Sequence, residues 1–272
     1  AVQACEGAVP EAVCAAGRDQ VALLLYTSGT TGAPKAAMLT HENLASAAAA
    51  AADMRDLRAD DVCFLALPLS HIFGIVTLLA VTLSQGAMRL EARFSAERLY
   101  EALQEDVTFL PAVPQMHAHL FHFARSQGKP RYTRGLLRYV SSGGAPLDPA
   151  WKREAEAFYG VALQNGYGMT EAAAGVCATK NALGDPDISV GKPMGQCRFR
   201  LDLEATGANP AEGIGEVLVA GPQVMKGYFR DPEQSAQAFT PDGFFRTGDL
   251  GRYDAEGRLY IVGRSKELII RS

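Results

Sequence analysis

The sequence has little of what would take a protein into a membrane, onto nucleic acid or out of the cell. Its most lipid-like run, residues 72–83, is far shorter than the roughly 20 residues that a spanning helix needs, and it predicts a buried helix. Residues 1–17 lack the basic start and the continuous apolar stretch of a secretion signal. The net charge of −4 predicts no nucleic-acid partner, because proteins that bind nucleic acid usually carry a basic face.

Cysteine and histidine are also sparse. The five cysteines are odd in number and include no C-x-x-C pair, which favours reduced, structurally minor thiols in a cytoplasmic protein. His117, His119 and His122 lie close together in the sequence. Residues 117 and 119 do not share a helical face, and the group lacks the acid or cysteine partners of a usual metal site. Metal binding there is therefore disfavoured.

What the sequence does have is an alternation of short apolar segments with segments of helical length. Residues 1–20 are unpatterned and predict a connecting arm, and residues 21–190 predict an α/β subdomain with a mostly parallel sheet and flanking helices. The first strand, 21–26, is all apolar and is expected to be buried on both faces. Further strands are expected at 61–69, 87–90, 107–113 and 136–144, and helices at 41–54, 72–83, 95–104, 114–126 and 148–160.

The pattern changes near residue 191. Short strand-like segments punctuated by Gly, Asp and Pro predict a small antiparallel β-barrel-like subdomain over 191–264, with a hairpin turn at "AEG". Residues 265–272 are expected to be a hinge to a further domain.

The stretch "YTSGTTGAPK", residues 26–35, concentrates small hydrogen-bond donors in one turn after an apolar strand. Backbone N–H groups of a glycine-rich turn, its hydroxyls and Lys35 suit a polyphosphate. The spacing is not that of the common P-loop, since Pro34 precedes the lysine and Ala36 follows it. An exposed Ser/Thr-rich connector is the alternative.

Four stretches in order resemble the adenylate-forming superfamily, which includes acyl-CoA synthetases, luciferases and the adenylation domains of peptide synthetases. They are "YTSGTTGAPKAAMLTHENL", "SSGGAPL", "NGYGMTE" and "FRTGDLGRYDAEGRLYIVGRSKELI". The match runs from about residue 21 to residue 270. It departs from the family at Ala36, where most members have glycine.

The resemblance implies that ATP and a carboxylic acid react to give an acyl-adenylate and pyrophosphate, with Mg²⁺ as cofactor and CoA as the later acceptor. Catalysis of this kind is mostly orientation and charge neutralisation. The phosphate loop would comprise Thr27, Ser28, Gly29, Thr30, Thr31, Gly32 and Lys35. Adenine and ribose would meet Gly143, Gly144, Ala145, Pro146, Asn165, Gly166, Tyr167, Gly168, Met169, Asp249 and Arg264.

The resemblance also gives roles to side chains near the reacting atoms. Thr170 would bond the α-phosphate, and Glu171 would hold Mg²⁺, which prefers oxygen ligands. Arg264 would contact ribose or phosphate, and His71 would orient or gate the acid. Each has a structural alternative: a solvated glutamate at a helix start, hairpin-turn residues for Asp249 and Arg264, a core aromatic for Tyr167, and a structural histidine for His71.

By resemblance the hinge is Lys266, and family members carry a preceding subdomain and a C-terminal domain that supplies the adenylation lysine. The sequence stops just past the hinge, so impaired turnover and self-association through exposed apolar surface are expected. The leading interpretation is the core of an acyl-CoA synthetase of the fatty-acid ligase type. A nucleotide-binding module without turnover, a peptide-synthetase-like adenylation domain and an idle scaffold are the alternatives.

The acid pocket is expected to be small or apolar. It would be lined by His71, Val113, Gly143, Gly168, Met169 and Ala173, with no arginine in these segments to pair a second carboxylate. This favours an aliphatic or aromatic monocarboxylic acid, while chain length and thiol acceptor stay open.

Overall fold

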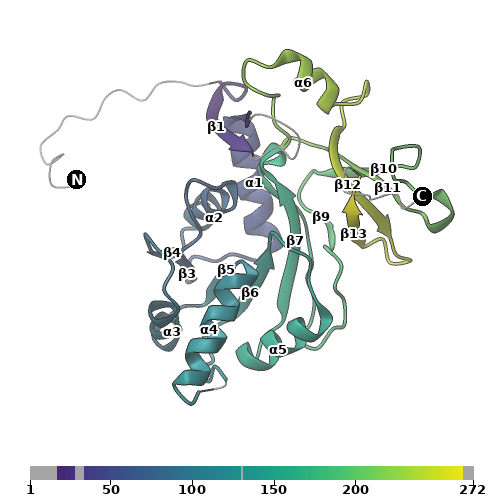
Figure 1. Cartoon of the computed structure of the whole chain (residues 1–272). Helices are drawn as coiled ribbons and strands as arrows, with labels where there is room; N and C mark the ends of the chain where they lie inside the picture. The colour runs from purple at the N-terminus through teal and green to yellow at the C-terminus, as the bar shows by residue number, and fades with distance from the viewer. Residues whose placement is uncertain (1–16, 28–33, 130, 266–272) are drawn as a thin grey trace, which may run out of the picture.

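A seven-stranded mixed sheet forms the centre of the protein (Figure 1). The computed structural model describes residues 17–27, 34–129 and 131–265. The strand order is β4-β3-β5-β6-β7-β8-β9. The first five strands are parallel, β8 is antiparallel to β7, and β9 is antiparallel to β8. The bounds are β3 Val62–Leu65, β4 Ala87–Leu90, β5 Phe109–Ala112, β6 Tyr139–Gly143, β7 Leu163–Met169, β8 Ala174–Ala178 and β9 Lys192–Pro193.

Two hydrophobic clusters pack against this sheet, each built on a different set of helices. One contains side chains of α3 (Ala96–Glu105), α4 (Pro114–Ser126) and α5 (Pro149–Tyr159). The other contains side chains of α1 (His41–Met54) and α2 (Ile72–Leu83). Helices that cover both sides of a mostly parallel sheet are the α/β arrangement that the alternating sequence pattern predicts, and this prediction is confirmed.

The helix starts follow from local side-chain chemistry. Thr40 accepts a hydrogen bond from the backbone N–H of Asn43, whose own side chain accepts from the N–H of Thr40, forming a capping box. Ser95 and Asp148 cap α3 and α5 in the same way, each accepting from the N–H three residues on. The expected helix boundaries agree with the structure to within about a residue because these caps are local.

The C-terminal part forms a four-stranded antiparallel sheet beside the large one, in the order β10-β11-β12-β13 (Figure 1). The strands are β10 Arg198–Asp202, β11 Gly215–Ala220, β12 Phe245–Tyr253 and β13 Leu259–Arg264, and helix α6 (Pro232–Ala238) lies between β11 and β12. Within the described residues the sheet is open, with β10 and β13 at its edges. The turn predicted at "AEG" joins β12 to β13, where the Gly257 N–H donates to the Asp254 carbonyl.

The segment 21–26 was expected to be a strand buried on both faces, and this prediction is wrong. Strand β1 (Val21–Thr27) lies outside the large sheet and forms an antiparallel hairpin with β2 (Lys35–Thr40), a strand the sequence pattern did not indicate. The side chains of Leu24 and Tyr26 are 42% and 71% exposed. A strand that pairs with one neighbour and covers the core with one face leaves its other face in water.

The apolar segment 72–83 forms the buried helix α2, as predicted. Over the described ranges, no helix is long and apolar enough to cross a membrane. The cysteines at 63, 177 and 197 are buried free thiols. The expected cytoplasmic location and self-association stay predictions.

Candidate functional site

Two predicted nucleotide motifs lie side by side at the carboxyl ends of adjacent parallel strands. Gly143, the last residue of β6, pairs with Gly166 in β7. Gly144, Ala145 and Pro146 are exposed beyond β6, and Gly144 has a φ of +82°, a conformation that favours glycine. A Cβ added at Gly143 would stand 3.4 Å from the ring of Phe73. The result is a strand-end surface without bulky side chains.

The small sheet contributes a carboxylate to this surface. The Tyr167 hydroxyl, on β7, donates a 2.5 Å hydrogen bond to Asp249 Oδ2, on β12. Asp249 also pairs with Arg264 across β12 and β13, with 3.1 Å between Oδ1 and Nε. Burial, and next the negative charge of Asp249, raises the pKa of the Tyr167 hydroxyl, which therefore stays a donor. The structure thus brings together three of the residues predicted to meet adenine and ribose: Tyr167, Asp249 and Arg264.

Glu171 follows β7 in the single turn η2 (Thr170–Ala172), whose backbone is held by the Met225 N–H donating to the Glu171 carbonyl at 2.8 Å. Oε1 of the Glu171 carboxylate accepts a 3.0 Å hydrogen bond from the Tyr228 hydroxyl. The Lys35 ammonium lies 5.1 Å from the centre of the Tyr228 ring. Glu171 and Lys35, both predicted from motifs, are therefore joined by Tyr228, which the sequence did not single out.

The turn between Gly168 and Ala174 is unusually tight. A Cβ on Gly168 would stand 1.9 Å from the Ala174 carbonyl oxygen across β7 and β8. Ala173 and Ala174 have φ values of +48° and +78°, which L side chains rarely adopt. This turn carries Thr170 and Glu171 out of the sheet directly after Met169, the last residue of β7.

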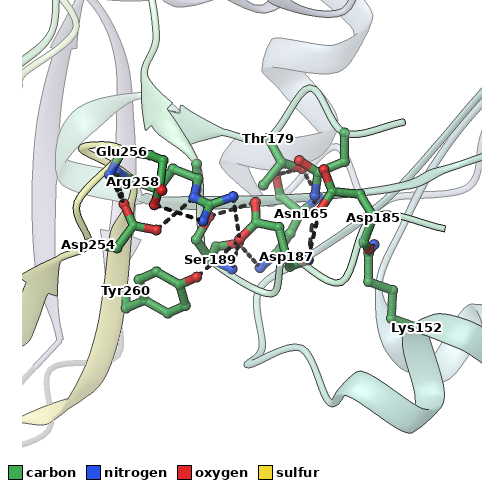
Figure 2. Close-up of polar contacts among 12 residues, drawn as sticks. Lys152, Asn165, Thr179, Asp185, Asp187, Ser189, Asp254, Glu256, Arg258 and Tyr260 are labelled. Carbon is green, nitrogen blue, oxygen red and sulfur yellow. Dashed lines mark hydrogen bonds and ion pairs between the residues drawn. The ribbon is translucent and has the colours of Figure 1, made fainter. Parts of the chain in front are cut away.

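Asn165 is 4% exposed and held by a polar cluster around Asp187 (Figure 2). Its Nδ2 donates to the Ser189 carbonyl at 2.8 Å, and its Oδ1 has no hydrogen-bond partner among the described residues. Asp187 in turn accepts from the Ser189 N–H, the Ser189 hydroxyl and the Tyr260 hydroxyl at 2.8, 2.9 and 3.3 Å. Sequence reasoning missed Asp187, Ser189 and Tyr260, because a single Asp or Ser between two motifs carries no pattern.

The predicted histidines have different environments. His71 is the exposed N-cap residue of α2, where its Nδ1 accepts from the Phe73 N–H at 3.3 Å. His117 is fully buried, with Nδ1 2.7 Å from the Tyr159 hydroxyl and Nε2 3.2 Å from the Ser141 carbonyl oxygen. Burial lowers the pKa of His117 to about 4. His117 is therefore a core residue with both ring nitrogens engaged.

Part of the predicted site lies outside the described residues. Thr27 and Lys35 are opposite each other at the loop end of the β1–β2 hairpin. Ser28, Gly29, Thr30, Thr31 and Gly32 between them, and Lys266 at the predicted hinge, are among the residues that are not described.

The residues that are described suit ATP and Mg²⁺. The unpartnered, buried Oδ1 of Asn165 is an acceptor for a donor such as the adenine amino group. Glu171 uses one carboxylate oxygen for Tyr228, so the other is available to a cation. The described residues contain no group of three or more His, Cys, Asp or Glu placed to hold a metal ion. A single carboxylate together with phosphate oxygens is a usual environment for Mg²⁺.

Comparison with known proteins identifies the family. Residues 2–229 match the AMP-binding enzyme family. The sulfoacetate–CoA ligase of Cupriavidus necator is 37% identical over 256 residues, which cover 93% of this chain and 49% of that protein. ATP-bound MatB from Rhodopseudomonas palustris has a TM-score of 0.85 at 37% identity, covering 99% of this chain and 53% of the other.

The O-succinylbenzoate coenzyme A synthetase (MenE) of Bacillus subtilis, solved in complex with ATP and a magnesium ion, has a TM-score of 0.84 at 31% identity. That match covers 94% of this chain and 52% of the other. The chain thus spans about half the length of the relatives it matches. Since the family match extends over most of its residues, the chain belongs to the AMP-binding enzyme family.

Proposed function

We propose that this chain forms the ATP- and acyl-adenylate-binding core of an AMP-forming acid–CoA ligase. The observation that carries the proposal is that the two ends of the segment from Tyr167 to Glu171 make different contacts. At one end Tyr167 contacts Asp249, a carboxylate with the acceptors to bind ribose hydroxyls. At the other end Glu171 connects through Tyr228 to Lys35, a cation beside the phosphate loop. A nucleotide laid along this segment would have its sugar and its phosphates at the matching ends.

In the proposed reaction a carboxylate oxygen of the acid attacks the α-phosphorus of ATP, and pyrophosphate leaves with the electron pair of the broken P–O bond. Thr170 hydrogen-bonds the α-phosphate, and Lys35 neutralises the leaving phosphates. Mg²⁺, when bound at Glu171, supplies further charge neutralisation. A CoA thiolate then displaces AMP from the acyl-adenylate in the whole enzyme.

We propose an apolar monocarboxylic acid, such as a fatty acid, as the substrate. Around the strand-end surface, His71 begins α2 and Val113 begins α4, and Phe73 borders Gly143. The named relatives act on sulfoacetate and on O-succinylbenzoate, so the acid differs between family members. The absence of arginine from the predicted pocket segments is what favours a single carboxylate here.

Calorimetric titration with non-hydrolysable acyl-adenylate analogues tests both parts of the proposal. Analogues bearing acetyl, octanoyl, palmitoyl, benzoyl and sulfoacetyl groups are compared on the 272-residue chain. Preference for octanoyl, palmitoyl or benzoyl supports an apolar acid, and preference for sulfoacetyl contradicts it. Loss of binding in Asp249→Ala, with the variant still folded at the titration temperature, ties the signal to the proposed ribose site. No binding of any analogue or of ATP would overturn the proposed nucleotide core.

A further inference from the structure

Tyr228 occupies a fixed position because its backbone is paired with the strand that leaves the phosphate loop. Residues 226–229 run antiparallel to β2, and Ala37 bridges Tyr228. The Met38 N–H donates to the Gly227 carbonyl at 2.9 Å, and the Phe229 N–H donates to the Ala36 carbonyl at 2.8 Å. This part of the chain, which comes after β11, therefore acts as a third strand beside the β1–β2 hairpin.

The Tyr228 side chain makes two different contacts from this position. Its hydroxyl donates to Glu171 Oε1 at 3.0 Å, and its ring face lies under the Lys35 ammonium at 5.1 Å from the ring centre. Lys35 Nζ also donates to Gln234 Oε1 at 2.6 Å, so the ammonium is held between an amide oxygen and an aromatic face. Only 8% of Tyr228 is exposed, which limits the rotamers it can adopt.

We propose that Tyr228 is a positioning residue for the metal and phosphate site, with its hydroxyl and its ring performing separate tasks. The hydroxyl holds one oxygen of Glu171, and the other oxygen would bind the cation. The ring holds the Lys35 ammonium over its face, so that one side chain positions both Glu171 and Lys35. This inference rests on the proposed function, since it assigns a role within the same nucleotide site.

Two physical effects support this division of tasks. A carboxylate that ligates a metal is commonly held by an outer hydrogen bond, and loss of such a bond typically costs about 10- to 100-fold in metal affinity. A cation over an aromatic face is stabilised by the ring alone, so it is retained when tyrosine becomes phenylalanine. Tyr228→Phe should therefore remove the first effect and preserve the second.

The test measures ATP affinity by calorimetry twice for each variant, once with excess Mg²⁺ and once with EDTA. The Mg²⁺ advantage is the dissociation constant of ATP in EDTA divided by its dissociation constant with Mg²⁺. Tyr228→Phe is expected to reduce this advantage by about 10-fold, with ATP affinity in EDTA changed less than about 2-fold. Tyr260→Phe is the matched control, because its hydroxyl also donates to a buried carboxylate, that of Asp187, away from Glu171. Its Mg²⁺ advantage should equal that of the parent chain.

A double-mutant cycle with Glu171→Gln separates positioning from a general effect on folding. If Tyr228 acts through Glu171, Tyr228→Phe has no further effect on the Mg²⁺ advantage in the Glu171→Gln background. An equal reduction in both backgrounds, or an unchanged advantage in Tyr228→Phe alone, overturns the inference. Failure of the parent chain to bind ATP under either condition contradicts the proposed function itself, and is thereby distinguished from failure of the inference.

Discussion

The hydroxyl of Tyr167 and the carboxylate of Asp249 meet at 2.5 Å, although 82 residues separate them in the sequence. Tyr167 stands on β7 of the large sheet and Asp249 on β12 of the small sheet. The contact therefore fixes the carboxylate that we propose to bind ribose relative to the strand that carries the proposed adenine and phosphate motifs. It is both a structural link and part of the proposed site.

Tyr167→Phe is expected to destabilise the protein by about 2 kcal/mol, because it removes a partly buried hydrogen bond to a charged group. Asp249 retains its 3.1 Å contact with Arg264, so the loss should stay moderate. Urea denaturation measures the free energy of unfolding. Tyr26→Phe serves as the control, since that side chain is 71% exposed. A loss below about 0.5 kcal/mol in Tyr167→Phe would show that the contact contributes little.

His117 predicts a dependence of stability on pH. Its pKa is lowered to about 4 by burial, against about 6.5 in an unfolded chain, so between these values the unfolded state binds the extra proton. The contribution is fully present above pH 6.5 and is lost as the pH falls toward 4, by about 3 kcal/mol in total. Denaturation curves at pH 7, 6, 5 and 4 measure it.

The control for this prediction is His117→Gln, which removes the titrating group and retains polar atoms between Tyr159 and Ser141. The difference in unfolding free energy between the parent chain and this variant isolates the histidine from the carboxylates that also titrate. The difference should change over pH 4 to 6.5 and be constant above pH 7. A difference that stays constant down to pH 4 would mean that His117 is not held neutral by the fold.

Gly168→Ala is expected to destabilise the protein by at least about 3 kcal/mol and to abolish nucleotide binding. The new Cβ would stand 1.9 Å from the Ala174 carbonyl oxygen, so β7 and β8 would have to separate beside Tyr167 and Thr170. Gly128→Ala is the matched control: its φ is +69° and no atom lies within 4 Å of the added Cβ. It should cost only about 1 kcal/mol, the penalty of the left-handed conformation. Equal losses in the two variants, measured by thermal melting, would contradict the steric argument.

Local signals explain how much of the fold could be predicted from the sequence. Helix α1 follows a capping box at Thr40 and Asn43, and α2 is a continuous apolar run, so each is specified within its own segment. Strand β1 is also apolar, but its burial depends on which strands lie beside it. Nothing within residues 21–26 indicates that β1 pairs only with β2 and leaves Leu24 and Tyr26 exposed to solvent.

The residues of the candidate site also divide into those that the local sequence indicates and those whose contacts depend on the fold. The motif residues Tyr167, Glu171 and Asp249 could be named from their sequence context, and the structure shows what each contacts. Tyr228 could not be named, because the role that we propose for it depends on pairing between residues 226–229 and β2. Asp187 was missed for the same reason, since its donors come from Ser189 nearby and from Tyr260, 73 residues away.

The polar cluster around Asp187 has a mechanical consequence when it is considered together with Tyr167 and Asp249. The hydroxyl of Tyr260, on β13, reaches Asp187 beside the large sheet, while Asp249, on β12, is held by Tyr167. With both hydrogen bonds intact, the small sheet can rotate relative to the large sheet only about the line that joins the two contacts. A large rotation of the small sheet about any other line would break at least one of these two hydrogen bonds, so Asp249 is held to the large sheet against such rotations.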